Sequence, residues 1–231
     1  MDPAREELFK LPRVMPPKGK GTLRITEIFL SLQGEGVFIG VPTVFVRTAI
    51  CNLRCSWCDS AYTFGPGKEM TLEAIIKEIQ QHKVKHVCIT GGEPLLQRET
   101  VTLIGRLLDL GYSMVLETGG SLSLEEVPTD ERVSISLDVK CPSSRMQDKM
   151  LFENIEFLGP TDQLKMVIQD RADYEYAKGI LEQYPVLAPV TLQPEGGKNL
   201  KNLAEWAMQD ALDVRVLPQL HKWIWGDVPG H

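Results

Sequence analysis

The sequence predicts an α/β fold, an incomplete (β/α) barrel whose parallel strands carry an active site at their C-terminal ends. Segments rich in β-branched and aliphatic residues alternate with segments whose apolar residues recur at helical spacing, which is typical of a parallel sheet with right-handed crossovers. Several strand-like segments are continuously apolar, as expected for parallel strands covered on both faces. The 231 residues hold about six such units, whereas a complete eight-unit barrel needs about 250 residues.

The strand-like and helix-like segments follow one another from residue 22 onward. Thr71 is a suitable N-cap for the first helix, and Gly111 follows the second helix where a left-handed residue is common. We expect strands at Leu23–Phe29, Thr43–Thr48, His86–Thr90, Ser113–Glu117, Val133–Val139, Gln163–Ile168, Val186–Leu192 and Asp213–Leu217. We expect helices at Thr71–His82, Arg98–Leu110, Asp173–Tyr184 and Asn199–Asp210.

Residues 1–20 differ from the rest of the chain. They contain four prolines and neither a helical nor a strand period. The sequence therefore predicts a loosely ordered N-terminal arm over residues 1–20, followed by a single domain over residues 21–231.

Composition excludes several classes of protein. With 43% hydrophobic and 24% charged residues, the chain has the balance of a soluble globular domain. No apolar run approaches the ~20 residues of a membrane span, and the acidic N-terminus does not resemble an export signal, so we expect a cytoplasmic protein without a membrane partner. The net charge is −6 without a basic block, which argues against a nucleic-acid partner. Five cysteines, an odd number, do not suggest a disulfide framework.

Polar and glycine-rich residues follow five of the predicted strands, always at the C-terminal end. In a β/α barrel those ends meet at one mouth, where active sites are built. The residues are the three cysteines after Thr43–Thr48, the TGGEP segment at 90–94, Glu117 with Thr118, Asp138 with Lys140, and Gln193 with Pro194.

Three of the five cysteines form a C-x3-C-x2-C motif, Cys51, Cys55 and Cys58. Three thiolates on one short loop can hold three corners of an iron–sulfur cube and leave the fourth iron open. The alternative is a zinc site, but structural zinc prefers four protein ligands. Cys88 lies within a predicted strand and is expected to be a buried, passive thiol, and nothing in the sequence fixes the position of Cys141.

These motifs resemble the radical S-adenosylmethionine superfamily, in the cysteine spacing, in Trp57 before the last cysteine and in the GGEP segment one strand later. The resemblance implies a barrel of the radical S-adenosylmethionine type, a [4Fe-4S] cluster on Cys51, Cys55 and Cys58, and bound S-adenosylmethionine. It also implies that the radical is carried by the adenosyl group of that cofactor, so no side chain is expected to be catalytic. The implied cofactor contacts are Trp57, Cys58, Asp59, Gly92, Asp138, Val139, Lys140 and Gln193.

A longer resemblance covers about nine-tenths of the chain. The segments EIFLSLQGEG at 27–36, LDVKCP at 137–142 and LPQLHKWIWG at 217–226 are similar to those of the 7-carboxy-7-deazaguanine synthases. This resemblance implies conversion of 6-carboxy-5,6,7,8-tetrahydropterin to 7-carboxy-7-deazaguanine with loss of ammonia, a lyase step in the biosynthesis of queuosine and other 7-deazapurines. It also implies a homodimer and an electron donor such as a flavodoxin or ferredoxin.

The two ends of such a substrate need different partners. Its pyrimidine edge donates N–H groups, for which Glu117 and Glu35 are candidate acceptors, and its carboxylate needs a cation, for which Arg47 and a magnesium ion at Ser60 are candidates. Ser60 stands where many family members have threonine, and it keeps the hydroxyl group. The resemblance adds Leu32, Gln33, Gly34, Thr90, His221 and His231 as substrate contacts.

Each of these residues also has an ordinary structural interpretation. Arg47 could pair with another acid, Glu117 could cap a loop, Ser60 could cap its own turn, and His221 could simply pack in the C-terminal segment. Two alternative functions remain at this point. A glycyl-radical enzyme activase would use the same cluster and cofactor on a protein substrate, and a non-catalytic zinc- or cluster-binding module would leave the polar strand ends unexplained.

Overall fold

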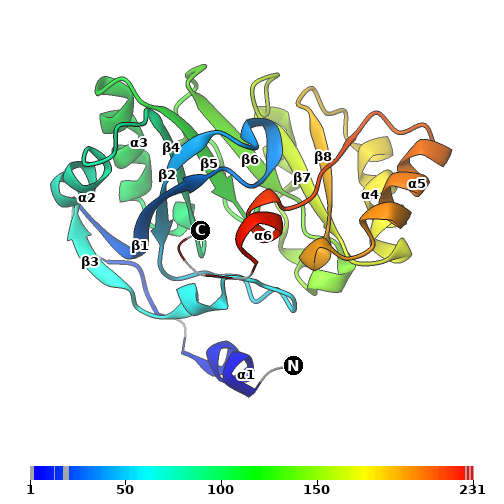
Figure 1. Cartoon of the computed structure of the whole chain (residues 1–231), viewed down its shortest axis with the longest axis horizontal. Helices are drawn as coiled ribbons and strands as arrows, with labels where there is room; N and C mark the ends of the chain where they lie inside the picture. Colours follow the sequence, from blue (N-terminus) through cyan, green and yellow to red (C-terminus); the bar gives the residue numbers. More distant parts are fainter. Residues whose placement is uncertain (1–2, 13, 18–20, 227, 229, 231) are drawn as a thin grey trace.

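The computed structural model describes residues 3–12, 14–17, 21–226, 228 and 230. Its centre is one sheet in the order β3-β1-β2-β4-β5-β6-β7-β8-β9 (Figure 1). The strands are β1 Thr22–Leu32, β2 Pro42–Thr48, β3 Lys68–Thr71, β4 His86–Gly91, β5 Ser113–Thr118, β6 Val133–Asp138, β7 Gln163–Ile168, β8 Val190–Pro194 and β9 Arg215–Val216. The sheet does not close on itself, which confirms the predicted incomplete barrel.

The first strand runs against the prediction of an all-parallel sheet. From β2 onward every neighbouring pair is parallel, but β1 is antiparallel to both β2 and β3. Only residues 33–41, with the single 3₁₀ turn η1 Gly36–Phe38, connect β1 to β2. A parallel connection needs a crossover of a dozen or more residues, so this short connection imposes the antiparallel pairing.

The four predicted helices are present. They are α2 Leu72–Ile79, α3 Glu99–Asp109, α4 Arg171–Gln183 and α5 Leu200–Gln209. The Thr71 side chain accepts a hydrogen bond from the Ala74 N–H and so caps α2 as expected. The remaining 3₁₀ turns are η2 Ala61–Phe64, η3 Pro94–Leu96, η4 Pro142–Ser144, η5 Gln147–Lys149, η6 Phe152–Phe157 and η7 Glu195–Gly197.

Several elements differ from the sequence prediction. Three elements were not predicted, namely β3, helix α6 Leu220–Trp225, and helix α1 Pro3–Lys10 within the expected N-terminal arm. Phe9 of α1 packs edge-on against Phe64 with the ring centroids 5.5 Å apart, a long-range contact that local periodicity cannot reveal. β8 begins at Val190 rather than Val186, and β9 is shorter than predicted.

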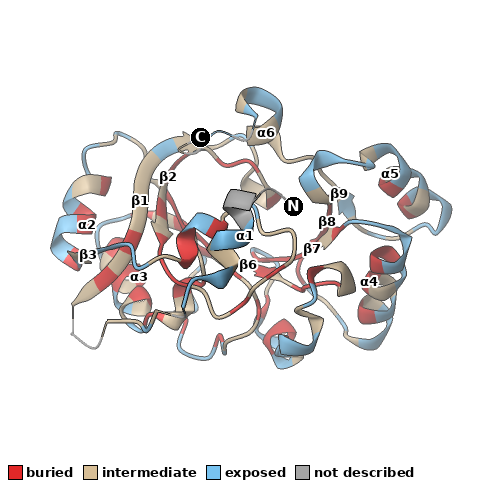
Figure 2. Cartoon of the chain, turned by 90° about the horizontal axis from the view of Figure 1, so that it is seen from below, coloured by how far each residue is buried: buried red, intermediate tan, exposed pale blue. Residues whose placement is uncertain are grey.

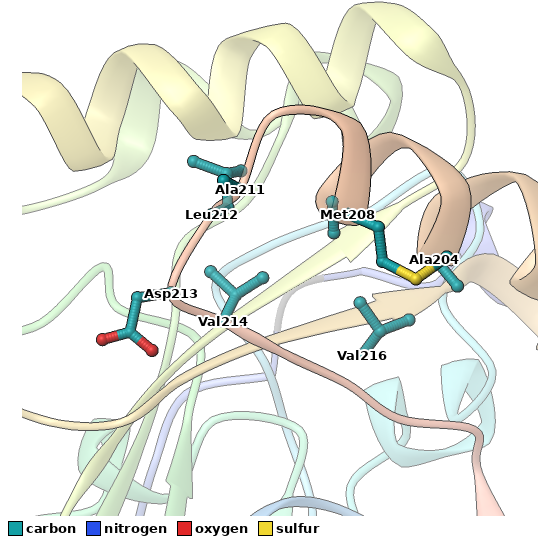
Figure 3. Close-up of a pocket in the computed structure, with 8 residues that line it drawn as sticks. Ala204, Met208, Ala211, Leu212, Asp213, Val214 and Val216 are labelled. Carbon is teal, nitrogen blue, oxygen red and sulfur yellow. The ribbon is translucent and has the colours of Figure 1, made fainter.

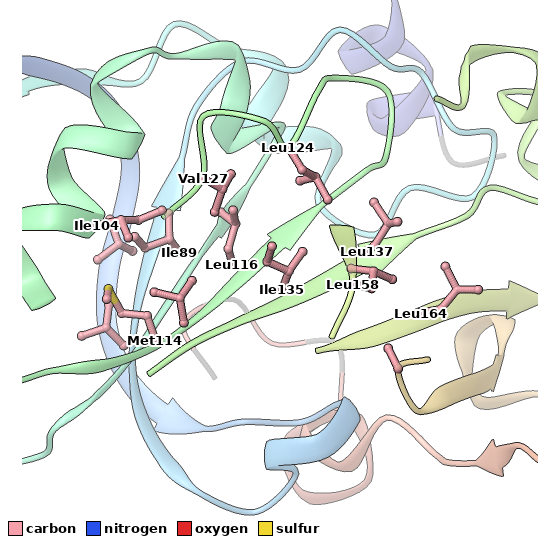
Figure 4. Close-up of a cluster of buried hydrophobic side chains, with 14 of the residues drawn as sticks. Ile89, Ile104, Met114, Leu116, Leu124, Val127, Ile135, Leu137, Leu158 and Leu164 are labelled. Carbon is pink, nitrogen blue, oxygen red and sulfur yellow. The ribbon is translucent and has the colours of Figure 1, made fainter. Parts of the chain in front are cut away.

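The apolar core lies between the outer face of the sheet and the helices (Figures 2 and 4). In β7 the residues Leu164, Met166 and Ile168 belong to this core, whereas the intervening Lys165 contacts acids on the inner face. The strands therefore alternate between an apolar outer face and a partly polar inner face. As predicted, the central parallel strands are covered on both faces, since nearly every residue of β6, β7 and β8 is buried.

Two segments cover the open side of the sheet. The N–H of Val37 in the β1–β2 connection donates to Gln163 Oε1 on β7 at 3.1 Å, and the N–H of Leu220 in α6 donates to the Gly34 carbonyl at 2.9 Å. Figure 2 shows α6 at the open side between β1 and β9. In the part of the chain that is described, no helix is long and apolar enough to span a bilayer.

Candidate active site

The cysteine loop, Cys51–Cys58, follows β2 directly. Leu53, Met146 and Met150 surround its three thiols, and this burial raises the pKa of Cys51 to about 12 and that of Cys58 to about 11. Free thiols here therefore carry protons at neutral pH, and assembly of a metal centre must release them.

The spacing of the thiols bears on which metal centre fits. Among the described residues, no three His, Cys, Asp or Glu side chains converge on a point that one metal ion could occupy. A cluster does not require such convergence, since each thiolate binds a different iron. The loop supplies three cysteine ligands, which suits such a cluster, whereas structural zinc prefers four protein ligands.

The GGEP segment packs against the cysteine loop. Thr48 and Gly91 are register partners on β2 and β4, and the N–H of Gly92 donates to the Thr48 carbonyl at 3.0 Å. A Cβ atom on Gly92 would lie 2.0 Å from the Ile50 carbonyl oxygen, and Gly91 has φ +132°. Both glycines are thus required by close backbone contact and conformation, and the Gly92 N–H is not free for a ligand.

Glu93 of this segment is a structural anchor. It is fully buried and accepts hydrogen bonds from the Gly119 N–H at 2.7 Å, the Thr118 hydroxyl at 2.9 Å and the Leu95 N–H at 3.1 Å. Burial raises its pKa, while these donors oppose the rise. Glu93 therefore fixes the ends of β4 and β5 relative to each other.

A cluster of lysine and acidic side chains lies inside the barrel. The Lys165 ammonium lies 2.7 Å from Glu35 Oε2, 3.0 Å from Glu117 Oε2 and 3.5 Å from Asp138 Oδ2. Asp138 also pairs with Lys140 at 3.0 Å. Burial raises the pKa of Glu117. Burial alone would also raise that of Glu35, but Lys165 and a hydrogen bond from Gln219 lower it to about 2.

Comparisons with known proteins agree with this site. Residues 45–153 match the radical SAM superfamily. A 7-carboxy-7-deazaguanine synthase of Thermoplasma acidophilum is 40% identical over 89% of this chain and 99% of its own length. One of Koribacter versatilis is 42% identical over 88% of this chain and 97% of its own length.

The chain belongs to the 7-carboxy-7-deazaguanine synthase family. The crystal structure of QueE from Escherichia coli superimposes with a TM-score of 0.73 at 25% identity, over 88% of this chain and 96% of that one. The cluster and S-adenosylmethionine are the cofactors of this radical SAM family, which confirms the cofactors that the motifs implied.

The residues expected to contact S-adenosylmethionine surround the cysteine loop and the strand ends. The Trp57 indole N–H donates to Ser143 Oγ at 3.0 Å, and Lys140 Nζ lies 5.6 Å from the Trp57 ring centroid. Gln193 is 1% exposed at the end of β8. Its amide nitrogen and oxygen, and Asp138 Oδ1, find no hydrogen-bond partner within the described chain. Buried, unpaired polar groups are costly, so these residues have the capacity that a polar ligand needs.

Arg47 and Ser60 are the residues expected at the carboxylate end of the substrate. Arg47 Nε donates to Glu27 Oε1 at 2.7 Å, and the Tyr62 hydroxyl donates to the same oxygen at 2.9 Å. Ser60 precedes η2 but makes no capping hydrogen bond with its side chain. Its hydroxyl lies 3.2 Å from Asp59 Oδ1 and 3.9 Å from Cys58 Sγ. The interpretation of Ser60 as a turn cap is therefore wrong.

The remaining predicted contacts lie around the β1–β2 connection. The His221 ring packs so closely on Gly34 that a Cβ atom there would lie 2.0 Å from Nδ1, and burial lowers the pKa of His221. Gln33 is buried, and its amide nitrogen has no partner among the residues described. Leu32 is half-buried at the end of β1, and Thr90 is half-buried on β4 beside Arg47 of β2. His231 lies outside the described residues.

Sequence reasoning missed two polar residues of this site, Lys165 and Gln219. Lys165 interrupts an otherwise mostly apolar strand, QLKMVI, and this alternation was the available signal. Gln219 donates to Glu35 Oε1 at 2.7 Å but comes from the segment before α6, whose position no local pattern predicts.

One apolar groove lies apart from the site. It lies between α5 and the segment that leads into β9 (Figure 3) and includes none of the predicted site residues. Its lining includes Ala204, Ala207, Met208, Leu212, Val214 and Val216.

Proposed function

We propose that this protein converts 6-carboxy-5,6,7,8-tetrahydropterin to 7-carboxy-7-deazaguanine with loss of ammonia. This reaction is a step in the biosynthesis of queuosine and other 7-deazapurines. The observation that carries the proposal is the convergence of the cysteine loop, the GGEP segment and the inner charged cluster at one end of an open barrel, in a chain of this family. The relatives are named for this product, and the chain aligns with nearly their whole length.

The cofactors supply chemistry that side chains cannot. When bound, the cluster and S-adenosylmethionine provide a radical able to remove a hydrogen atom from carbon. Cys51, Cys55 and Cys58 would hold the cluster, and Trp57, Asp59, Gly92, Asp138, Val139, Lys140 and Gln193 would line the S-adenosylmethionine site. The protein itself holds the two ligands in register and excludes water.

The substrate orientation follows from charge. Glu117 would accept N–H groups from the pyrimidine edge, and Arg47 would bind the carboxylate end through its terminal nitrogens. A magnesium ion at Ser60 would add a hard cation beside that carboxylate, with water completing its coordination. His221, Gln33, Gly34, Leu32, Thr90 and His231 would complete the substrate site.

Partners are part of the proposal. Reduction of the cluster requires an external electron donor, for which a flavodoxin or ferredoxin is suitable, and we propose a homodimer as the working unit. We also propose that residues 1–20 form an N-terminal arm and that residues 21–231 form one catalytic domain. We propose a cytoplasmic location for the protein.

The decisive test is anaerobic turnover with S-adenosylmethionine, a reductant and the carboxypterin, followed by mass analysis. Formation of 7-carboxy-7-deazaguanine and ammonia supports the proposal. Cleavage of S-adenosylmethionine without conversion of the pterin would refute it and would favour the activase alternative. A chain that holds zinc and shows no visible absorption of a cluster after anaerobic reconstitution would refute both enzymes.

A further inference from the structure

In the inner charged cluster, the ammonium group of one lysine, Lys165, lies between three carboxylates. Lys165 is 6% exposed at its side chain and comes from the middle of β7. Its partners come from three other segments, Glu35 from the β1–β2 connection, Glu117 from β5 and Asp138 from the end of β6. Burial of an ammonium group costs free energy unless the group is paired in this way. The ion pairs therefore fix the Lys165 side chain and the three carboxylates relative to one another.

The two glutamates differ in their remaining capacity to accept hydrogen bonds. Both carboxylate oxygens of Glu35 are occupied, Oε1 by the Gln219 amide at 2.7 Å and Oε2 by Lys165 at 2.7 Å. Glu117 is held at Oε2 alone, at 3.0 Å. Its Oε1 has no hydrogen-bond partner among the described residues. The exposed fractions of the two side chains are similar, 16% for Glu117 and 14% for Glu35. An ionised carboxylate has about four acceptor positions, so about three remain on Glu117 and about two on Glu35. Of the two residues, only Glu117 has a whole carboxylate oxygen without a protein donor, and this oxygen can receive two donors.

We propose that Lys165 is a positioning residue, which holds the Glu117 carboxylate where it can bind the pyrimidine edge of the substrate. In this proposal Glu35 has a structural role and does not itself bind the substrate. This inference rests on the proposed function. Glu35 joins the β1–β2 connection and the segment before α6 to β7, through Lys165 and Gln219. Removal of the Glu35 carboxylate therefore lowers the affinity for every ligand of the site. Removal of Lys165 instead frees the Glu117 carboxylate to move, and with it the preference for ligands that donate hydrogen bonds to Glu117 is lost.

The electrostatics supports a dependence on pH. Burial and the charges of Glu35 and Asp138 raise the pKa of Glu117, and Lys165 opposes that rise. Cys88 on β4 also senses the Glu117 charge, and its thiol stays protonated because burial raises its pKa. Glu117 accepts two N–H donors only when ionised, so ligand binding is lost as pH falls through its pKa. Without the Lys165 ammonium that pKa is higher still, and the loss begins at a higher pH.

Two stable ligands separate the roles. The oxidised 6-carboxypterin presents an amino group at C2, whereas 6-carboxylumazine presents a carbonyl oxygen there. Because a carboxylate oxygen repels a carbonyl oxygen, the wild-type protein, reconstituted with its cluster, should bind the pterin more tightly. One charged hydrogen bond contributes about 1.5–3 kcal/mol, which corresponds to roughly a 10- to 150-fold preference.

The experiment measures the dissociation constants of both ligands across pH by titration calorimetry. Lys165→Gln is expected to reduce the preference for the pterin by roughly tenfold or more and to move the acid limb of pterin binding to higher pH. Lys165→Arg, which keeps the charge, should restore part of the preference. Glu35→Gln should weaken both ligands by the same factor and keep the preference. Lys178→Gln, at a lysine paired with Asp210 on the surface, is the matched control and should bind both ligands as wild type does.

Folding of each variant is checked by its iron content and its thermal unfolding. If Lys165→Gln does not fold, the double variant Lys165→Gln with Glu35→Gln removes one charge of each sign and should show the same loss of preference. If that variant also fails to fold, the Glu35→Gln protein provides the test. Loss of its preference for the pterin would mean that Glu35 binds the substrate directly, which would overturn the inference. A folded Lys165→Gln protein with the wild-type preference and acid limb would also overturn it. Failure of the proposed function is a different result, in which the wild-type protein binds neither ligand.

Discussion

The orientation of the substrate can be tested by removing one contact at each end. Arg47 is 17% exposed at its side chain, and its Nε is committed to Glu27 at 2.7 Å. Its terminal nitrogens have no hydrogen-bond partner within the described residues, so they can hold a carboxylate with two parallel bonds. Arg47→Lys keeps the charge and loses this fork. Glu117→Gln keeps the size and replaces one acceptor oxygen by a donor that opposes the N–H groups of the ligand.

The expected magnitudes follow from those contacts. Loss of one charge-assisted hydrogen bond costs about 1.5–3 kcal/mol, so Arg47→Lys should weaken binding of 6-carboxypterin roughly 10- to 150-fold. Pterin itself, which lacks the carboxylate, should bind to Arg47→Lys as it binds to wild type. Glu117→Gln should weaken both ligands by a similar factor.

Calorimetric titration of the two ligands into the two variants and the wild-type protein provides the measurement. Unchanged iron content and melting temperature serve as the control for folding. If Arg47→Lys weakens pterin as much as 6-carboxypterin, Arg47 supports the site only through Glu27. If Glu117→Gln affects only the carboxylated ligand, the substrate lies the other way round.

The other predictions concern the cofactor and the metal ion. Replacement of any one cysteine of the cysteine loop by alanine should remove the bound iron and the activity, whereas Cys88→Ala, in the middle of β4, should keep nearly all of both. Iron counts on the reconstituted variants test this, and full iron in any loop variant would overturn the cluster assignment. Added magnesium should raise the activity, and Ser60→Ala should weaken that response at unchanged iron content. Superimposable magnesium titrations of the two proteins would show that Ser60 binds no metal. Gly92→Ala places a Cβ atom 2.0 Å from the Ile50 oxygen, so both the iron content and the melting temperature should fall, the latter by about 2–4 °C for each kcal/mol lost. A variant unchanged in both would mean that the turn adapts freely.

Local pattern was sufficient for most of the strands and helices. The segment Gln163–Ile168 forms β7 with the predicted bounds, because an apolar outer face and β-branched residues act within the segment itself. The direction of β1 depends instead on the length of its connection to β2, a fact that strand propensity does not contain. Helix α1 is short and lies among prolines, and its contact with Phe64 joins residues far apart in the sequence.

The site was predicted unevenly for a similar reason. Motifs at strand ends indicated where the chemistry lies, because parallel strands bring their C-terminal ends to one edge. The partners of those residues could not be read from the sequence. Lys165 lies inside a strand, and Gln219 comes from a segment without regular pattern. Both are found only when the barrel is assembled around Glu35.

The pairing of the cysteine motif with the GGEP segment has a physical explanation in this sheet. β2 and β4 are neighbours in parallel register, with Arg47 opposite Thr90 and Thr48 opposite Gly91. The segments that leave the two strands must therefore run side by side, and the Glu93 N–H donates to the Ile50 carbonyl at 2.9 Å as they do so. A side chain at position 92 would separate them. The glycines thus keep the cysteine loop against the turn, and a cluster and a cofactor bound by these two segments would be held in contact by the backbone itself.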